Sequence, residues 1–381
     1  MLPLLPLKPV PSIPPRHWPE LASELQALGM RWVDQDGPGL SRTGGAGPSD
    51  HKAVTLGGAT VMVPIFTHSS KTSPYVAEVS REGNAATLLR DGVAVAELGF
   101  PKQPRFYTRS TASGIPYWKI ATLHAADVLA TTVLQTCTRY GNRATSCQFC
   151  AIGQSLKAKS TIPEKTPEML AEVARAAVEL DGVKHAVLTT GTPATSDRGA
   201  AVLADCTRAI KAAVDLPVQA QCEPPDDFAW FDRLAAAGVD SLGMHLEAVT
   251  EEVRHRIMPG KAEVPVTMYL EAFEYAVRVF GRGQVSTYIL AGLGDSRAAI
   301  LEMSERLIGL GVYPFVVPFV PIAGTPLEHH AAPTPSFMQG LLSDLAALLR
   351  REDMQSSSIK AGCGRCGACS SLRVREAVQH A

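Results

Sequence analysis

Apolar runs alternate with amphipathic stretches along most of the chain after residue 127. Six short runs rich in Val, Ile, Leu and Ala predict buried strands at 128–135, 185–190, 217–221, 241–245, 284–291 and 313–317. Apolar positions at helical spacing predict helices at 167–179, 200–214, 226–236, 267–279, 297–308 and 335–351. Strands that alternate with helices favour a parallel sheet covered by helices. Six such repeats are fewer than the eight of a complete β/α barrel.

The first 125 residues follow a different pattern, with more strand-like than helical segments. A proline-rich lead over 1–15 precedes a short amphipathic helix at 20–28, and strands are expected at 54–66, 75–80 and 85–98. Asp91-Gly92 suits the positive φ angles of a two-residue hairpin turn. The glycine-rich stretch 42–51, flanked by Arg42 and His51, is either an anion cradle or a plain flexible loop.

These patterns predict three parts. They are a β-rich module over 1–125, a β/α module over 126–332, and a helix with a cysteine-rich tail over 333–381. With 381 residues, 46% apolar and 19% charged, the chain has the composition of an ordinary globular protein. A net charge of −1 indicates neither nucleic-acid nor anionic-membrane binding.

The amino-terminal residues are apolar but broken by prolines, and we expect no signal peptide there. The sequence has no run of 18 apolar residues, so we expect no membrane span and a cytoplasmic location. Six of the eight cysteines fall in two groups of three. Such grouping is typical of metal sites in a reducing compartment rather than of a disulfide framework.

The first cysteine group follows the strand predicted at 128–135. Cys137, Cys147 and Cys150 have the spacing C-x9-C-x2-C, on a loop at the carboxyl end of that strand. Three thiolates on one loop suit a soft metal centre. A [4Fe–4S] cluster usually takes four protein thiolates, so three would leave one iron open for a small molecule. A structural zinc loop is the alternative, but zinc needs a fourth ligand and the loop contains no histidine.

This loop resembles the cluster loop of the radical SAM superfamily. That superfamily usually shows C-x3-C-x-aromatic-C after the first barrel strand, and Cys147-Gln148-Phe149-Cys150 matches its second half, with Phe149 as the aromatic residue. The first gap departs from the pattern, with nine residues in place of three. The resemblance implies a partial (β/α)6 barrel, in agreement with the six predicted strands. With the cysteine-rich tail, the chain resembles a subfamily of unassigned reaction often encoded beside nitrilases.

The resemblance also implies residues that bind S-adenosylmethionine after the second and third strands. Thr190 and Gly191 stand where the superfamily has a Gly-Gly-Glu stretch that holds the amino group of the cofactor. The glycine is present and the acidic residue is not. A threonine hydroxyl or a backbone carbonyl would therefore accept the hydrogen bond from the amino group instead. A plain strand-to-helix turn is the alternative. Glu223 ends the third strand and would present a carboxylate at the barrel mouth.

Three more candidates follow the fourth and fifth strands. The stretch from Glu247 to Lys261 is similar to lipoyl synthase and biotin synthase, which implies that Glu247 holds the ribose hydroxyls. It also implies that Arg256 pairs with the methionine carboxylate, a task suited to a guanidinium. The alternatives are a helix N-terminal charge for Glu247 and a solvated helix face for Arg254 and Arg256. Gly292 lies in a stretch that resembles the element packed near the adenine.

The second cysteine group lies in the tail. Cys363, Cys366 and Cys369 have the opening spacing of a ferredoxin-type run, whose fourth position would be Arg373. The local ligand set is therefore three, and the group predicts an auxiliary iron–sulfur cluster, with a zinc knuckle as the alternative. Its fourth ligand would be Cys222, the substrate, or nothing. Cys206 falls in a predicted helix, where a core thiol is expected.

The resemblance implies a definite reaction. A flavodoxin- or ferredoxin-type donor supplies one electron, and the C5′–S bond of S-adenosylmethionine breaks to give methionine and a 5′-deoxyadenosyl radical. The radical then takes a hydrogen atom from a small-molecule substrate in the barrel mouth. The alternatives are a β/α-barrel binding protein with two structural metal loops, and an electron carrier with two clusters. The sequence names neither the substrate nor the product.

Overall fold

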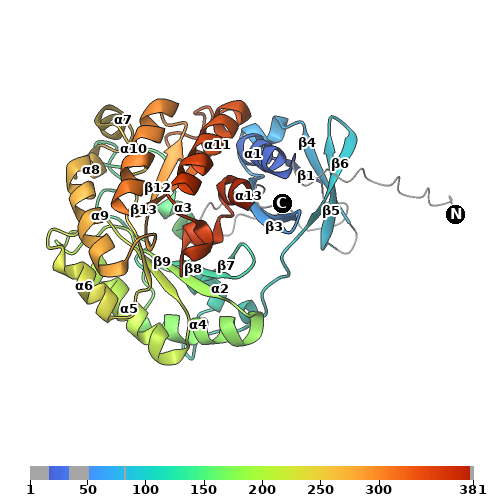
Figure 1. Ribbon diagram of the computed structural model, residues 1–381. Helices are drawn as coiled ribbons and strands as arrows, with labels where there is room; N and C mark the ends of the chain where they lie inside the picture. Colours follow the sequence, from blue (N-terminus) through green and yellow to red (C-terminus); the bar gives the residue numbers. More distant parts are fainter. Residues whose placement is uncertain (1–16, 34–50, 81–82, 378–381) are drawn as a thin grey trace.

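Two separate sheets organise the chain (Figure 1). The computed structural model describes residues 17–33, 51–80 and 83–377. The predicted proline-rich lead and positions 42–50 of the glycine-rich stretch lie outside these residues. No helix in the described part of the chain is long and apolar enough to cross a membrane.

The larger sheet has seven strands in the order β13-β12-β11-β10-β9-β8-β7. Its six parallel strands follow the chain order and are β8 (Val128–Thr132), β9 (His185–Thr189), β10 (Val218–Gln221), β11 (Ser241–Gly243), β12 (Val285–Ala291) and β13 (Val312–Pro318). The short strand β7 (Thr122–His124) adds an antiparallel edge beside β8. Every residue of β8, β10 and β13 is buried, as expected for a parallel sheet covered on both faces. The predicted partial (β/α)6 barrel is confirmed.

Helices surround this sheet on its outer side (Figure 1). They are α4 (Pro167–Asp181), α5 (Ala200–Ala213), α6 (Ala229–Ala236), α9 (Val266–Phe280), α10 (Arg297–Leu310) and α11 (Pro335–Arg351). Three of them begin at a hydroxyl cap, because Thr166, Ser296 and Thr334 accept hydrogen bonds from backbone N–H groups of the first turn. Shorter helices lie near the site, and they are α2 (Tyr117–Ile120), α3 (Ile152–Lys157), α7 (Glu251–Ile257) and α8 (Pro259–Ala262).

The smaller sheet belongs to the N-terminal part and has six strands in the order β1-β4-β5-β6-β2-β3. They are β1 (Arg31–Val33), β2 (His51–Leu56), β3 (Ala59–Pro64), β4 (Tyr75–Val79), β5 (Ala85–Arg90) and β6 (Val93–Gly99), and helix α1 (Trp18–Leu28) packs against β3. The hairpin at Asp91-Gly92 forms as predicted, with φ angles of 49° and 81°. The single strand expected at 54–66 is wrong, because Gly57 and Gly58 turn the chain into a β2–β3 hairpin.

The C-terminal tail lies between the two sheets. Its helices α12 (Cys363–Cys366) and α13 (Leu372–Ala377) follow α11. On one side, Gly362 N–H donates to His185 Nδ1 and Cys363 N–H donates to Gln219 Oε1, both at 3.1 Å. His185 and Gln219 lie at the amino ends of β9 and β10. On the other side, Met62 N–H donates to the Ala368 carbonyl at 2.8 Å. The tail therefore closes the amino end of the barrel and ties it to the N-terminal sheet.

Candidate active site

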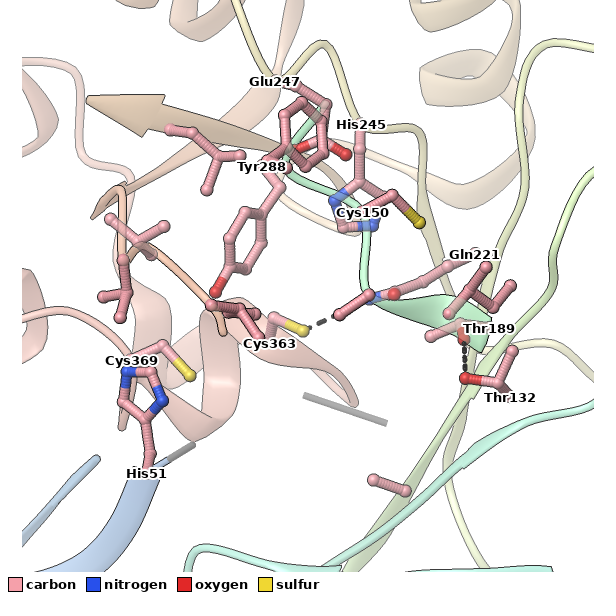
Figure 2. Close-up of a pocket in the computed structure, with 18 of the residues that line it drawn as sticks. His51, Thr132, Cys150, Thr189, Gln221, His245, Glu247, Tyr288, Cys363 and Cys369 are labelled. Atoms are coloured by element: carbon pink, nitrogen blue, oxygen red, sulfur yellow. Dashed lines mark hydrogen bonds between the residues drawn. The ribbon is translucent and has the colours of Figure 1, made fainter. Parts of the chain in front are cut away.

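A cavity of about 390 Å³ lies inside the barrel and meets both cysteine groups (Figure 2). Phe149 and Cys150 of the first loop line it, and so do Cys363 and Cys369 of the tail. Its other polar lining groups include Gln26, His51, His124, Thr132, Gln135, Thr189, Thr190, Gln221, His245, Glu247 and Tyr288. The loop lies at the carboxyl ends of the strands and the tail at their amino ends. The two predicted metal groups therefore face one cavity from opposite ends.

The first cysteine loop leaves β8 and runs closely along the end of β9. Gly191 N–H donates to the Leu134 carbonyl at 2.9 Å, and Thr138 N–H donates to the Thr192 carbonyl at 2.8 Å. A Cβ atom at Gly191 would overlap the carbonyl oxygen of Thr136. Glycine is therefore required at this position for a close backbone approach. The sequence signal at Gly191 has a structural cause, whatever ligand binds there.

The far side of the loop packs against α7 and α8. Gln148 N–H donates to the Ile257 carbonyl at 2.8 Å, and the Gln148 side-chain amide donates to the Arg256 carbonyl at 2.7 Å. Gly260 N–H donates to the Thr145 carbonyl at 3.1 Å. These bonds fix a loop that has no regular structure over most of its length. They place Cys147 and Phe149 against the apolar side chains of α7 and the strand ends.

The three loop thiols lie near one another and are free of disulfides. Cys150 interacts electrostatically with both Cys137 and Cys147. Burial raises the pKa of Cys147 to about 12, although Lys261 opposes this, and burial raises the pKa of Cys150 to about 11, against a hydrogen bond from the Ile152 N–H. Buried thiolates therefore need a cation, and a thiolate-bound metal supplies one. The donor set fits a soft iron–sulfur centre.

A single bound ion fits this arrangement less well. In the described residues, no group of three or more His, Cys, Asp or Glu side chains is arranged to hold one metal ion. Thiolates that bind different irons of a cluster are farther apart than ligands of one zinc.

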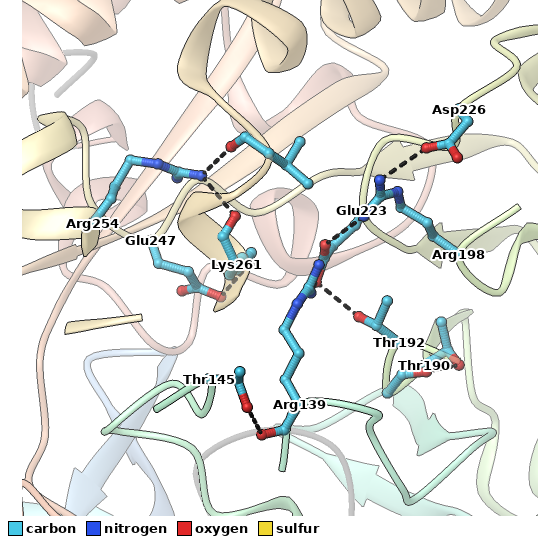
Figure 3. Close-up of polar contacts among 12 residues, drawn as sticks. Arg139, Thr145, Thr190, Thr192, Arg198, Glu223, Asp226, Glu247, Arg254 and Lys261 are labelled. Atoms are coloured by element: carbon cyan, nitrogen blue, oxygen red, sulfur yellow. Dashed lines mark hydrogen bonds and ion pairs between the residues drawn. The ribbon is translucent and has the colours of Figure 1, made fainter. Parts of the chain in front are cut away.

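Beside the loop, Glu223 forms a buried ion-pair network (Figure 3). It pairs with Arg139 of the loop and accepts a hydrogen bond from the Thr192 hydroxyl at 2.8 Å. Burial alone would raise the pKa of Glu223, but Lys261 and Arg139 outweigh it and the net shift is downward. Arg198 Nη1 lies 3.7 Å from the other carboxylate oxygen, Oε2, which has no hydrogen bond in the described part of the chain. The expected carboxylate at the end of β10 is present and held in its ionised form.

Glu247 is the second carboxylate near the loop. Its φ angle of 66° is unusual for a residue other than glycine, and its backbone bonds on both sides to β12, with Tyr288 and Leu290. Its Oε1 lies 3.3 Å from the buried Lys261 ammonium. Backbone strain of this kind gathers at functional sites. The carboxylate lines the cavity, so the structure brings it to the place that the sequence indicates.

The two arginines of α7 have different environments. Arg254 is fully buried, donates to the carbonyls of Leu246 and Val264 at 2.8 and 2.9 Å, and stacks on Tyr269. The alternative of a solvated helix face is therefore wrong for Arg254. Its guanidinium donates hydrogen bonds to buried loop carbonyls, which would otherwise have no partner. Arg256 is exposed and donates to the Leu293 carbonyl at 3.1 Å.

Two further predicted residues lie at strand ends. The Thr190 side chain lines the cavity, and its hydroxyl donates to the Gly191 carbonyl at 2.8 Å. Gly292 has a φ angle of 111°, its carbonyl lies 3.0 Å from His330 Nε2, and a Cβ atom there would meet Pro333. The structure thus places Gly292 in a tight backbone contact after β12.

The tail thiols are each the acceptor of a hydrogen bond. The Gln221 amide donates to Cys363 Sγ at 3.2 Å, the Ala368 N–H donates to Cys366, and the Tyr288 hydroxyl donates to Cys369. Burial raises the pKa of Cys366 to about 12 and raises that of Cys363 and Cys369 as well. Donors directed at three partly buried cysteines are typical of metal-bound thiolates, whose charge they stabilise.

Cys222 is separated from this group. It is buried in the main apolar core, and it follows Gln221, whose side chain points into the barrel toward Cys363. Successive side chains of a strand point to opposite faces, so the Cys222 thiol faces the helices. The structure does not support Cys222 as the fourth ligand. Cys206 is buried in α5 within the same core, as expected.

Several residues at this site were not among the candidates that the sequence indicated. Arg139 and Lys261 supply the cations between Glu223, Glu247 and Cys147, and His124, Gln221 and Tyr288 surround the tail thiols. Arg139 could have been found from its place inside the cysteine loop, and Lys261 from its place after Pro259-Gly260. The other three depend on strand register and on the path of the tail.

Comparison with known proteins agrees with this geometry. Residues 135–307 match the family model described as Radical SAM superfamily. A bacteriochlorophyllide c C-7(1)-hydroxylase of Chlorobaculum limnaeum is 32% identical over 126 residues, which cover 32% of this chain and 31% of the relative. A probable dual-specificity RNA methyltransferase RlmN of Rhodopirellula baltica is 26% identical over 136 residues, which cover 35% of this chain and 37% of the relative. The matched segment thus spans about a third of each relative.

Solved structures of similar proteins include methylornithine synthase (PylB), with a TM-score of 0.46 and 17% identity over 64% of this chain and 67% of that one. A radical SAM methyltransferase from Sphaerobacter thermophilus has a TM-score of 0.45 and 18% identity over 79% of this chain and 82% of that one.

Residues 135–307 therefore form a radical SAM domain. Members of this superfamily are enzymes that use an iron–sulfur cluster and S-adenosylmethionine.

Proposed function

We propose that this chain is a radical SAM enzyme in which Cys137, Cys147 and Cys150 hold a [4Fe–4S] cluster. The observation that carries the proposal is that Cys150 and Phe149 line the 390 Å³ cavity, so a cofactor on the loop would face a bound substrate. When bound, the cluster and S-adenosylmethionine supply a 5′-deoxyadenosyl radical, which abstracts a hydrogen atom from the substrate. The fold supplies orientation and exclusion of water.

The charged groups beside the loop suit a zwitterionic cofactor. Glu247 would accept hydrogen bonds from ribose hydroxyls, because its carboxylate lines the cavity next to the loop. The Thr190 hydroxyl and the Gly191 carbonyl would accept hydrogen bonds from the amino group of S-adenosylmethionine. Lys261 and Arg139 lie between the carboxylates and Cys147, and they would balance the negative charge of thiolates and carboxylates. Arg256 would reach the methionine carboxylate from the rim, and Gly292 would allow close packing near the adenine.

The cavity lining supports a small, largely apolar substrate. The described lining combines apolar side chains with neutral polar groups such as Thr132, Thr189 and Gln221, and Glu247 is its one carboxylate. No lysine or arginine of the described residues lines it, and the net charge of the chain is −1. These features support a small molecule rather than a nucleic acid as the substrate. An external donor of flavodoxin or ferredoxin type would supply the electron.

We further infer that Cys363, Cys366 and Cys369 hold an auxiliary iron–sulfur centre at the other end of the cavity. Three sulfurs that each accept a hydrogen bond support bound metal there. Cys363 and Cys369 line the cavity, so this centre would lie beside the substrate.

The test of the proposed function is turnover under strictly anaerobic conditions. The full-length protein is reconstituted with iron and sulfide, reduced with dithionite and mixed with S-adenosylmethionine, and 5′-deoxyadenosine is measured by chromatography. The proposal predicts that 5′-deoxyadenosine forms in proportion to cluster content. Protein that binds zinc in place of iron and forms no 5′-deoxyadenosine would contradict it and favour a barrel with structural metal loops.

A further inference from the structure

The fourth ligand of the tail centre can be sought among the side chains around its thiols. Cys363 and Cys369 line the cavity, and the described lining contains three histidines, His51, His124 and His245. Of these, His124 meets a tail thiol, because its Nε2 lies 3.7 Å from Cys369 Sγ. His124 ends β7, the edge strand that pairs with β8, so its backbone is held by the sheet.

This separation is close to the one that two ligands of a single metal atom require. Metal–sulfur and metal–nitrogen bonds of about 2.3 and 2.0 Å at a tetrahedral angle place the sulfur and the nitrogen about 3.5 Å apart. Neutral imidazole nitrogen and thiolate sulfur are both ligands of iron and zinc. A hydrogen bond from a neutral thiol to the ring would give a similar distance, and the experiment below separates the two cases.

The tail cysteines supply only three ligands, so the His124 ring could serve as the fourth. Cys363, Cys366 and Cys369 already accept hydrogen bonds from Gln221, Ala368 and Tyr288. An iron–sulfur centre is usually held by four protein ligands, and the tail sequence supplies three.

A second histidine, His51, lies near His124 in the same cavity. His51 on β2 lines the same cavity and interacts electrostatically with His124. Its Nδ1 is buried and has no hydrogen-bond partner among the residues that the structure describes. A buried ring nitrogen without a partner is costly in a metal-free site. Among the described residues, His124 is the histidine that contacts a tail thiol, so His124 lies within reach of the centre and His51 lies in its surroundings.

We propose that His124 completes the tail triplet into a Cys3His metal centre in which His124 and Cys369 bind the same metal atom. This inference rests on the proposed tail centre and adds the ligand that it lacks. In a four-iron cluster each iron takes one protein ligand, whereas in a two-iron cluster each iron takes two. The shared atom therefore points to a two-iron cluster, with Cys363 and Cys366 on the second iron.

The test uses full-length protein in which Cys137, Cys147 and Cys150 are replaced by serine, so that only the tail can hold a cluster. After anaerobic reconstitution, iron and sulfide are counted and the dithionite-reduced centre is examined by pulsed EPR for a strongly coupled nitrogen. We expect about two irons per chain and a clear nitrogen coupling. Adding His124→Cys should keep the iron and abolish the coupling. Adding His51→Asn, the matched control from the same cavity, should keep both.

The outcomes that overturn the inference are distinct. Nitrogen coupling that persists in His124→Cys, or disappears in His51→Asn, would assign the ligand elsewhere. About four irons per chain would refute the shared metal atom. Failure of the serine background to bind any metal would refute the tail centre itself. The loop assignment would survive that result, because it is tested separately by 5′-deoxyadenosine formation in the unaltered protein.

Discussion

The two cysteine groups meet one cavity but occupy different environments. The loop group lies at the carboxyl ends of the strands, where Arg139, Lys261, Glu223 and Glu247 surround it with charge. The tail group lies at the amino ends, where Gln221, Tyr288 and a backbone N–H donate to its sulfurs. Charged surroundings suit a loop that must bind a charged, exchangeable cofactor. Neutral hydrogen-bond donors suit a permanently bound metal centre, because hydrogen bonds to its sulfurs adjust its reduction potential.

The difference also appears in how each group is held. The loop spans nine residues between Cys137 and Cys147 and depends on contacts with β9, α7 and α8. The tail group is compact, with two of its cysteines in one helical turn, and it is fixed between the barrel and the N-terminal sheet. The N-terminal module thus has a structural role, because Met62 and Gln26 both bond to the Ala368 carbonyl beside the thiols.

The largest expected effect separates the two groups directly. Cys147→Ala should reduce 5′-deoxyadenosine formation to background, because the loop then lacks one of its three thiolates. Cluster content and 5′-deoxyadenosine are measured together on anaerobically reconstituted protein. The control is Cys206→Ala, a core thiol of α5, which should keep activity. S-adenosylmethionine cleavage at wild-type rate in Cys147→Ala would contradict the assignment of the loop.

The charged side of the comparison depends on Glu223. Glu223→Gln should lower the free energy of unfolding by about 3 kcal/mol, since it leaves the nearly buried Arg139 without its partner. Chemical denaturation of the apoprotein measures this. The matched control is Glu305→Gln. The ion pair of Glu305 with Arg351 is exposed, so its loss should not measurably change the free energy of unfolding.

The same carboxylate gives a pH dependence with a definite sign. The pKa of Glu223 is lowered in the folded protein, so its contribution to stability is present above the ordinary pKa of a glutamate and is lost as pH falls through the lowered value. Stability of wild type should therefore fall more steeply below pH of about 4.5 than stability of Glu223→Gln. Parallel pH profiles for the two proteins would show that the buried pair does not titrate as described.

A smaller effect is expected from the close contact between Gly191 and the cysteine loop. Gly191→Ala should push the loop away from β9, because its Cβ would overlap the Thr136 carbonyl. We expect a several-fold loss of iron from the loop centre and little change in the tail centre. Gly309→Ala is the control, since nothing lies within 4 Å of the added atom in α10, and alanine should stabilise that helix by up to about 1 kcal/mol. Equal iron loss from both centres would mean that the two groups are coupled through the fold.

The smallest effect concerns the neutral donors of the tail. Gln221→Leu removes the amide that donates to Cys363, so the reduced centre loses a stabilising hydrogen bond. The reduction potential of the tail centre should become more negative, while the potential of the loop centre stays unchanged. A redox titration followed by EPR measures both potentials. An unchanged tail potential would mean that the Gln221 contact does not persist when metal is bound.

Much of this molecule could be predicted from its residues. Strand β13 is a nearly continuous apolar run, because a parallel sheet that is covered on both faces has no polar face. Cysteine spacing pointed to the loop and the tail, since ligands of one centre gather locally in sequence. Glu223 and Glu247 could be placed near the mouth because the carboxyl ends of parallel strands meet at one edge.

What escaped prediction depends on contacts between distant segments. A solvated helix face was an alternative for Arg254, yet the residue is buried, because the carbonyls of Leu246 and Val264 in the loops around it need its donors. His124 and Tyr288 lie far from the tail in sequence and come to its thiols only when the tail enters the amino end of the barrel. The β2–β3 hairpin was missed because two consecutive glycines interrupt an otherwise strand-like run.

One comparison tests the central claim that two separate centres face one cavity. Three proteins are reconstituted side by side and reduced: the unaltered chain, one with Cys137, Cys147 and Cys150 replaced by serine, and one with Cys363, Cys366 and Cys369 replaced by serine. EPR spectra are recorded with and without S-adenosylmethionine. The account predicts that the tail variant keeps a signal that changes with S-adenosylmethionine, and that the loop variant keeps a signal that does not. Loss of both signals in either variant, or a response to S-adenosylmethionine from the loop variant, would contradict it.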